Sequence, residues 1–330
     1  MKLRGGLPLL FLFITFMFLN LLFGSVRINF IEILKIFLGL SNNDLEKMII
    51  LDIRLPRVIS SMVVGLGLAC VGNTFQGLLK NPLIDPYILG ISAGASFGTV
   101  LSIFLGELIG TFWFKKLRIL NFFFAVLASF IPLMIAKKGK RVLITELVLG
   151  GVIIGTLFSS ATILLIILSK RNITHISIWL FGSFSGLGWG DVIIVTIPAL
   201  TFVIISYAFW NELNAMALGE EEAMVSGVNT EKLKVFLYIA GSLTTAFFVS
   251  RTGAIGFIGL IVPHMARRIV GANYKDSIFA SAIMGGIILS LCDSISRSLF
   301  NPTELPVGVI TALLGAPMMI FLLKSGVKNV

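Results

Sequence analysis

The chain has 330 residues, of which 57% are hydrophobic and only 13% are charged. Soluble globular domains usually carry about 25% charged residues, so this composition excludes a soluble globule and indicates a protein of the lipid bilayer. The formal net charge of +10 could suggest nucleic acid, but the Lys and Arg residues lie in short segments between apolar runs and form no basic face, so we expect membrane-flanking charges and no nucleic-acid partner.

Apolar windows predict ten membrane spans, because about 20 apolar residues cross the hydrocarbon core as a helix. The first window could be taken for a secretory signal, but no small-residue cleavage pattern follows it, so we interpret it as a membrane helix. The eighth is too short for a simple crossing, and its glycines and proline favour an irregular or partly buried segment. We therefore expect an all-α polytopic membrane protein with a single transmembrane domain over residues 1–330. The predicted spans are 7–26, 58–79, 90–110, 119–136, 143–168, 191–210, 232–250, 256–270, 277–299 and 307–324.

The segment KNPLIDP at residues 80–86 separates the second and third spans, and its two prolines forbid helix continuation. In the third span, Gly90, Gly94 and Gly98 recur every four residues. Small residues at this spacing let a neighbouring backbone approach closely, so we expect them to serve helix packing, with the lining of a passage as the alternative.

Residues 90–94, GISAG, also match the nucleophile elbow of hydrolases, but that chemistry needs a strand before the serine and a triad histidine. The chain has only His175 and His264, predicted near opposite membrane faces. Cys70 and Cys292 both fall inside apolar spans, which argues against a disulfide or a metal site. We expect no catalytic residues and no metal ligands.

A polar segment at about residues 211–231 separates the sixth and seventh spans and contains LGEEEAMVSGV at residues 218–228. Glycines fence this stretch, so it predicts a short amphipathic helix, with a plain solvated turn as the alternative. No GxxxxGK[ST] motif occurs in the sequence, so the chain has no Walker A loop. We expect no cofactor on this chain: if ATP drives its activity, another polypeptide must bind ATP and Mg²⁺.

The chain resembles the FecCD/BtuC-type permeases, the transmembrane subunits of type II ABC importers in the iron-siderophore, haem or cobalamin uptake family. The resemblance covers nearly the whole chain, and chance agreement over so many spaced glycines and prolines is negligible. It rests on RLPR at 54–57, Gln76, NPL at 81–83, DP at 85–86, LG at 89–90, GAIGFIGL at 253–260, Pro263, His264, Arg267, ELPVG at 304–308 and LGAP at 314–317.

This resemblance implies ten helices per subunit and two subunits around a central pathway. It places the protein in the cytoplasmic (inner) membrane with both termini in the cytoplasm, an orientation that the distribution of Lys and Arg alone hardly decides. The implied partners are two ATP-binding cassette subunits, a substrate-binding protein and a second permease subunit, in a homodimer or a heterodimer.

Particular residues acquire roles from the same resemblance. The cytoplasmic loop would couple to the ATPase through Leu218, Gly219, Glu220, Ala223 and Gly227. Outer arginines would receive glutamates of the binding protein at Arg54, Arg57 and Arg297, although interfacial anchoring, or an i,i+4 pair between Arg297 and Asp293, is the alternative. The start of the fifth span would form the cytoplasmic gate, with bulkier and more charged residues than is usual: Leu143, Ile144, Thr145 and Glu146.

The expected function is therefore ATP-driven import of a metal chelate, most simply a ferric siderophore. A pathway for haem would be expected to contain His or Tyr side chains. The chain has only 2 His and 4 Tyr, which favours a ferric siderophore over haem. The same fold carrying haem, cobalamin or a molybdate-type oxyanion is one alternative. An ion-coupled secondary transporter is another, but it should show intramembrane acids, and only Glu146 and Asp293, both near span ends, are candidates. An intramembrane enzyme is a third alternative, but the sequence contains no set of catalytic residues that would support it.

Overall fold

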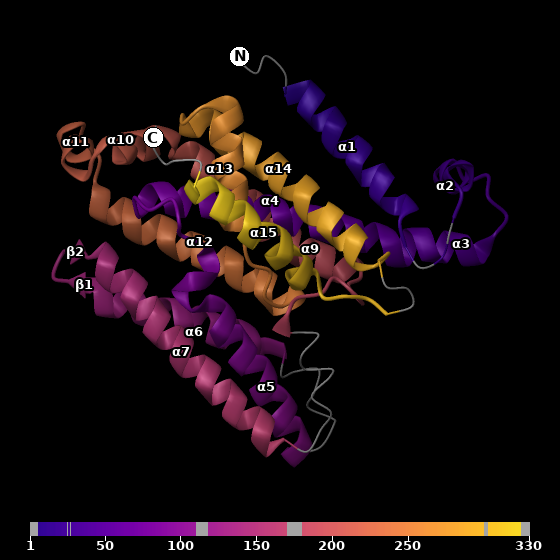
Figure 1. Ribbon diagram of the computed structural model, residues 1–330, viewed down its shortest axis with the longest axis horizontal. Helices are drawn as coiled ribbons and strands as arrows, with labels where there is room; N and C mark the ends of the chain where they lie inside the picture. The colour runs from indigo at the N-terminus through magenta and orange to yellow at the C-terminus, as the bar shows by residue number, and fades with distance from the viewer. Residues whose placement is uncertain are drawn as a thin grey trace.

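The computed structural model describes residues 6–24, 26, 28–109, 118–169, 180–299 and 303–324. Within these ranges the chain consists of helices and one two-stranded hairpin (Figure 1). In chain order the elements are α1 (Gly6–Leu22), α2 (Phe30–Phe37), α3 (Asp44–Met48), η1 (Ile49–Arg54), α4 (Leu55–Leu78), η2 (Pro86–Leu89), α5 (Ile91–Ile109), α6 (Arg118–Ala136), β1 (Lys137–Lys138), β2 (Arg141–Val142), α7 (Ile144–Leu168), α9 (Trp189–Ala208), α10 (Trp210–Leu218), α11 (Glu220–Val225), α12 (Thr230–Thr252), α13 (Ile258–Val270), α14 (Tyr274–Ser296) and α15 (Val307–Lys324).

The predicted all-α fold is confirmed. Among the described residues, six helices are long and apolar enough to cross a membrane, and three shorter apolar helices span 11–22, 91–106 and 307–321. Each predicted span coincides with a helix to within a few residues, and α13 is the short eighth one. The main difference is that α4 continues N-terminally through η1 into α3, so that one helical stretch begins at Asp44. The predicted second span begins at residue 58, directly after the charged Arg54 and Arg57. In the structure both arginine side chains lie inside the bundle, where they donate hydrogen bonds to Leu21 and Asp293.

Helix α4 forms the centre of the bundle, where it contacts α1, α9, α12, α13 and α14 and has most of its side chains buried. A Cβ atom on Gly65 would lie 2.2 Å from the carbonyl oxygen of Gly285 in α14. One on Gly72 would lie 1.9 Å from the carbonyl oxygen of Gly259 in α13. Helix α4 therefore meets both neighbours backbone to backbone, an approach that only small residues allow.

Helices α5, α6 and α7 form a second group, which lies beside the α4-centred group in Figure 1 and contacts it through α12. The predicted glycine stripe lies at the contacts within this second group. A Cβ on Gly94 or Gly98 would lie 2.3 or 2.5 Å from a carbonyl oxygen of α6. Gly90 has a φ of +86°, which glycine adopts without strain, and it faces the carbonyl oxygen of Gly151 in α7.

Two interruptions of the helices meet inside the bundle. The chain leaves the helical conformation between α4 and η2, and again between α12 and α13, where Phe257 has a φ of +70°. The buried Asp85 carboxylate joins them, because it accepts the N–H of Tyr87 at 2.9 Å and the N–H of Phe257 at 3.0 Å. Backbone amides away from water need such partners, so this carboxylate allows α13 to begin inside the protein. The expected irregular eighth span is confirmed.

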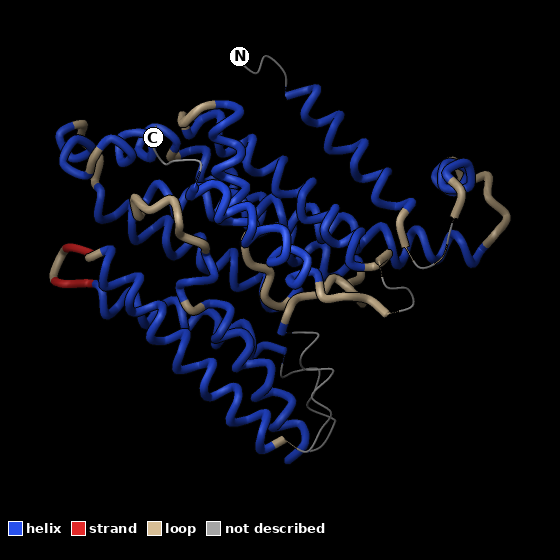
Figure 2. The backbone as a smooth tube through the Cα atoms, viewed as in Figure 1, coloured by secondary structure: helices blue, strands red, loops and turns tan. Residues whose placement is uncertain are grey.

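The hairpin lies at the same end of the bundle as α10 and α11, on the left in Figure 2. Its strands are antiparallel, with Lys137 opposite Val142 and Lys138 opposite Arg141. We call this end of the molecule the coupling end, after the role that the sequence predicted for residues 211–231. Helices α2 and α3 and η1 lie at the opposite end, which we call the arginine end because η1 finishes at Arg54.

Candidate functional site

The segment between α9 and α12 projects from the coupling end. Helix α10 ends at Leu218, and Gly219 separates it from the six-residue α11. Gly227 adopts a φ of +86°, and the next residue, Val228, donates its N–H to the carbonyl of Ala223 at 3.0 Å. A short helix between two glycines is therefore present where the sequence predicted it, whereas α10 was not predicted.

Helix α11 has one buried side chain at its centre and large apolar side chains exposed around it. Ala223 is fully buried and belongs to the hydrophobic cluster that also contains Leu213 of α10 and Leu233 of α12. By contrast, Leu218 and Val225 are 82% and 90% exposed, and Met224 is 49% exposed. Exposed apolar side chains outside the apolar spans are typical of a surface that another protein covers.

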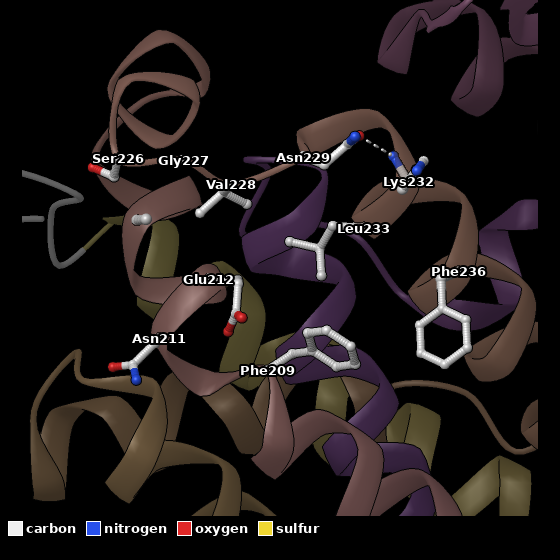
Figure 3. A pocket seen from close by; sticks show the side chains of 11 residues that line it. Phe209, Asn211, Glu212, Ser226, Gly227, Val228, Asn229, Lys232, Leu233 and Phe236 are labelled. Carbon is white, nitrogen blue, oxygen red and sulfur yellow. Dashed lines mark hydrogen bonds between the residues drawn. The ribbon is translucent and has the colours of Figure 1, made fainter.

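A pocket of about 580 Å³ lies beside this segment, where α10 meets the start of α12 (Figure 3). The aromatic rings of Phe209 and Phe236 and the polar side chains of Asn211, Glu212 and Lys232 contribute to its lining. The Oε2 atom of Glu212 is buried and has no hydrogen-bond partner among the described residues. This combination can receive a side chain with an apolar stem and a hydrogen-bond donor at its tip.

The predicted gate residues lie at the start of α7, directly after the hairpin. Leu143 is the N-cap of α7 and donates its N–H to the carbonyl of Ala136 at 3.0 Å. Glu146 forms an ion pair with Lys138 of β1. Leu143 and Thr145 are exposed, whereas Ile144 is half-buried. The hairpin and the first turn of α7 are therefore tied into one unit, and the gate role of these residues stays a prediction.

The three predicted docking arginines lie at the arginine end, and all are buried: Arg54, Arg57 and Arg297 are 4%, 7% and 4% exposed. Arg54 donates to the backbone carbonyls of Leu21, at 2.8 Å, and Val26, where α1 ends. Backbone carbonyls at a helix end lack partners within the helix, and a guanidinium supplies them.

Arg57 is held by two carboxylates at once. Its Nε and Nη2 atoms donate to Asp293 of α14 at 2.9 to 3.1 Å, and its Nη1 atom donates to Glu304 at 2.9 and 3.0 Å. Asp293 is 1% exposed, whereas the Glu304 side chain is 37% exposed. The surface-accessible member of this ion cluster is therefore an acid.

Arg297 completes the cluster. Its Nη2 atom donates to the carbonyl of Asn20 at 2.6 Å and to the Ser294 hydroxyl at 3.1 Å, and its Nε atom lies 3.9 Å from Asp293. The i,i+4 pair considered from the sequence is thus present but long, and Asp293 binds Arg57 more closely. A docking role for these arginines stays a prediction, because it requires them to exchange partners within the protein for partners outside it.

The outward faces of α7 and α15 are strongly apolar. Either lipid or a second membrane subunit can cover such faces, because apolar side chains need no hydrogen-bond partners. The exposed residues are Leu149, Val152, Ile153, Leu157, Ile163, Leu164, Ile167 and Leu168 of α7, and Leu313, Leu314, Ile320 and Phe321 of α15.

Across the described parts of the chain, no three His, Cys, Asp or Glu side chains gather closely enough to hold a metal ion. Cys70 and Cys292 are buried free thiols. His175 lies outside the described residues.

Sequence and structure comparisons identify relatives over almost the whole length. The profile of the FecCD transport family matches residues 11–325. The ABC transporter permease protein YvrB of Bacillus subtilis, itself uncharacterized, is 38% identical over 288 residues, covering 86% of this chain and 80% of the relative. The cobalamin import system permease protein BtuC of Halobacterium salinarum is 37% identical over 281 residues, covering 84% and 74%. A transporter assigned to the metal-chelate type of ABC transporters, solved in an inward-facing conformation, matches with a TM-score of 0.83 and 29% identity, covering 97% of this chain and 98% of the other.

Proposed function

The chain belongs to the FecCD transport family, and on this premise we propose that it carries a metal chelate, in the first place a ferric siderophore, through the membrane. It is the multi-pass permease subunit of an ABC importer, a transport component and not an enzyme. The observation that carries the proposal is the match in fold to a metal-chelate type transporter over 97% of this chain.

ATP and its Mg²⁺ are bound by two cassette ATPase subunits, which dock on α11. The sequence supplies no Walker A loop, so the nucleotide must lie on another polypeptide. The exposed Leu218, Met224 and Val225 support docking at this place, because burying them against a partner removes apolar surface from water. Since ATP is cytoplasmic, the coupling end faces the cytoplasm. The family resemblance places both termini on the same side of the membrane.

The arginine end then faces outward and receives the substrate-binding protein. A carboxylate of that protein can take the place of Glu304 on Arg57, because Glu304 is the part of the cluster that solvent reaches. The exchange replaces one charge-assisted hydrogen-bonded pair by another, so its net cost is small. Exchange of this kind reconciles buried arginines with a docking role.

A second copy of the permease packs on the exposed apolar faces of α7 and α15, and the cargo passes between the two subunits. A homodimer is the simplest arrangement. Haem, cobalamin or a molybdate-type oxyanion are the alternative cargoes within the same fold. An ion-coupled carrier would need free acids in the membrane, and its two candidates are engaged: Asp293 by Arg57, and Glu146 by Lys138.

Docking of the ATPase can be tested by replacing an exposed apolar side chain on α11 with a charged one. Val225→Glu places a charge in the proposed contact and should abolish both co-purification with the cassette ATPase and ATP hydrolysis by the complex. Leu45→Glu is the matched control, because Leu45 is 74% exposed and lies in α3, at the arginine end. Full retention of the ATPase by the Val225→Glu variant would show that the ATPase docks elsewhere.

A further inference from the structure

A buried lysine lies behind α11, near the start of α12. The Lys234 side chain is 3% exposed, and its ammonium donates to Glu220 of α11 at 2.7 Å and to Glu231 at 2.6 Å. The third acceptor is the backbone carbonyl of Val142 in β2, at 3.4 Å. A lysine ammonium has three donors and no acceptor, so these three partners use all of its hydrogen-bonding capacity.

The second oxygen of Glu231 closes the same network. It accepts the N–H of Val142 at 2.7 Å, so Glu231 and Lys234 hold the peptide groups on both sides of this residue. Val142 directly precedes Leu143, the N-cap of α7, and the hairpin is tied to α7 through Lys138 and Glu146. The network thus connects α11, the start of α12 and the start of α7, three elements that are far apart in the sequence.

Stability alone gives a weak reason for this arrangement. Buried ion pairs can often be replaced by apolar residues of similar volume without loss, and their best-attested use is to fix one arrangement among several. Burial would raise the pKa of the Glu220 carboxyl, but the hydrogen bond and charge of Lys234 outweigh it, so the pKa lies below its ordinary value. Glu220 is therefore charged at cytoplasmic pH, and the pair with Lys234 is maintained there.

We propose that Lys234, Glu220 and Glu231 are positioning residues that transmit movement of α11 to the hairpin and the start of α7. This inference rests on the proposed function, in which the ATPase docks on α11. When the ATPase displaces α11, Glu220 moves with it and draws Lys234, and through Glu231 and the Val142 peptide the first turn of α7 follows. Breaking the link should leave ATP hydrolysis in place and remove its effect on the pathway.

The measurement is the number of cargo molecules taken up per ATP hydrolysed, in proteoliposomes that contain the complete transporter with its ATPase and binding protein. Glu220→Gln and Glu231→Gln each keep the side-chain shape and remove one charge from the link. For Glu231→Gln, which lies in α12 and outside the docking helix, we expect hydrolysis near the wild-type rate and a transport ratio lowered at least about fivefold, the lower end of typical couplings between sites. Glu220→Gln should lower the transport ratio by a similar factor. Misfolding would lower both activities together, so the ratio separates positioning from a structural role.

Two further variants sharpen the test. Glu221→Gln is the matched control, because Glu221 lies next to Glu220 in α11 but its side chain is exposed and makes no ion pair among those described, and it should transport like the wild type. The double change Glu220→Gln with Glu231→Gln should be no worse than either single change, because one break already interrupts the same chain of contacts.

Wild-type transport ratios in both single variants, or effects that multiply in the double variant, would overturn the link while leaving the permease function intact. Failure of the proposed function would look different, because the wild-type complex itself would then show no ATP-dependent uptake.

Discussion

Asp293→Asn is the change that best probes how the arginine end is held together. Asp293 accepts three hydrogen bonds from Arg57 at 2.9 to 3.1 Å and lies 3.9 Å from Arg297, and it is 1% exposed. Asparagine keeps the size but loses the charge, and its NH₂ group must face a guanidinium donor. The cluster then has two buried arginines, Arg57 and Arg297, and only Glu304 to balance them.

Removing one partner of a buried ion pair usually costs 3 to 5 kcal/mol, and because asparagine keeps one acceptor oxygen we expect about 3 kcal/mol for Asp293→Asn. The free energy of unfolding can be measured by SDS titration in mixed micelles, followed by far-ultraviolet circular dichroism. Glu304→Gln is the control: its side chain is 37% exposed, and such pairs contribute at most about 1 kcal/mol. Equal, small losses in the two variants would refute the idea that the buried carboxylate fixes α4 against α14.

Three other changes test different parts of the structure. Gly65→Ala should lower the free energy of unfolding by about 1 to 3 kcal/mol, because its Cβ would lie 2.2 Å from the carbonyl oxygen of Gly285. Gly190→Ala is the control, because a Cβ there would meet no atom within 4 Å and should not destabilise the protein. Equal unfolding energies in the two variants would contradict the close packing of α4 on α14. Ala223→Pro removes the hydrogen bond from the N–H of residue 223 to the carbonyl of Gly219 and should cost about 3 kcal/mol within α11. Transport should then fail while membrane insertion survives. Normal cargo-stimulated ATP hydrolysis in the purified variant would exclude α11 as the coupling helix. In a chain with Cys70 and Cys292 replaced by alanine, an impermeant thiol reagent should reach Ser226→Cys only from the cytoplasm and Asn42→Cys only from outside, and the reverse labelling would invert the proposed orientation.

Much of the fold could be predicted from the sequence because the bilayer imposes a simple rule: a backbone in hydrocarbon must form helices about 20 residues long. The ten apolar windows therefore matched helices, and even the short eighth window was identified from its length and glycines. The contact by which Asp85 joins the two helix interruptions could not be predicted, since its partner, the N–H of Phe257, is 172 positions away.

The candidate site was less predictable, for the same reason of distance. Glycines mark the ends of α11 locally, so that helix could be located. Arg57, however, is paired with Asp293 and Glu304, 236 and 247 positions further along, and no local spacing indicates such pairs. Lys234 was missed although one signal was available: Glu231 lies three residues before it, on the same helical face. Its contacts with Glu220 and Val142 depend on how α11, α12 and the hairpin pack.

The central claim is that this chain moves its cargo only when a partner ATPase hydrolyses ATP. The most direct measurement is uptake into proteoliposomes that hold the chain, its cassette ATPase and its binding protein, with a ferric siderophore, haem, cobalamin and molybdate each offered in radiolabelled form. We predict accumulation of one of the four with ATP and Mg²⁺ inside the vesicles, and none when the Walker A lysine of the ATPase is replaced. Accumulation driven by a proton or sodium gradient in vesicles without the ATPase would contradict the claim.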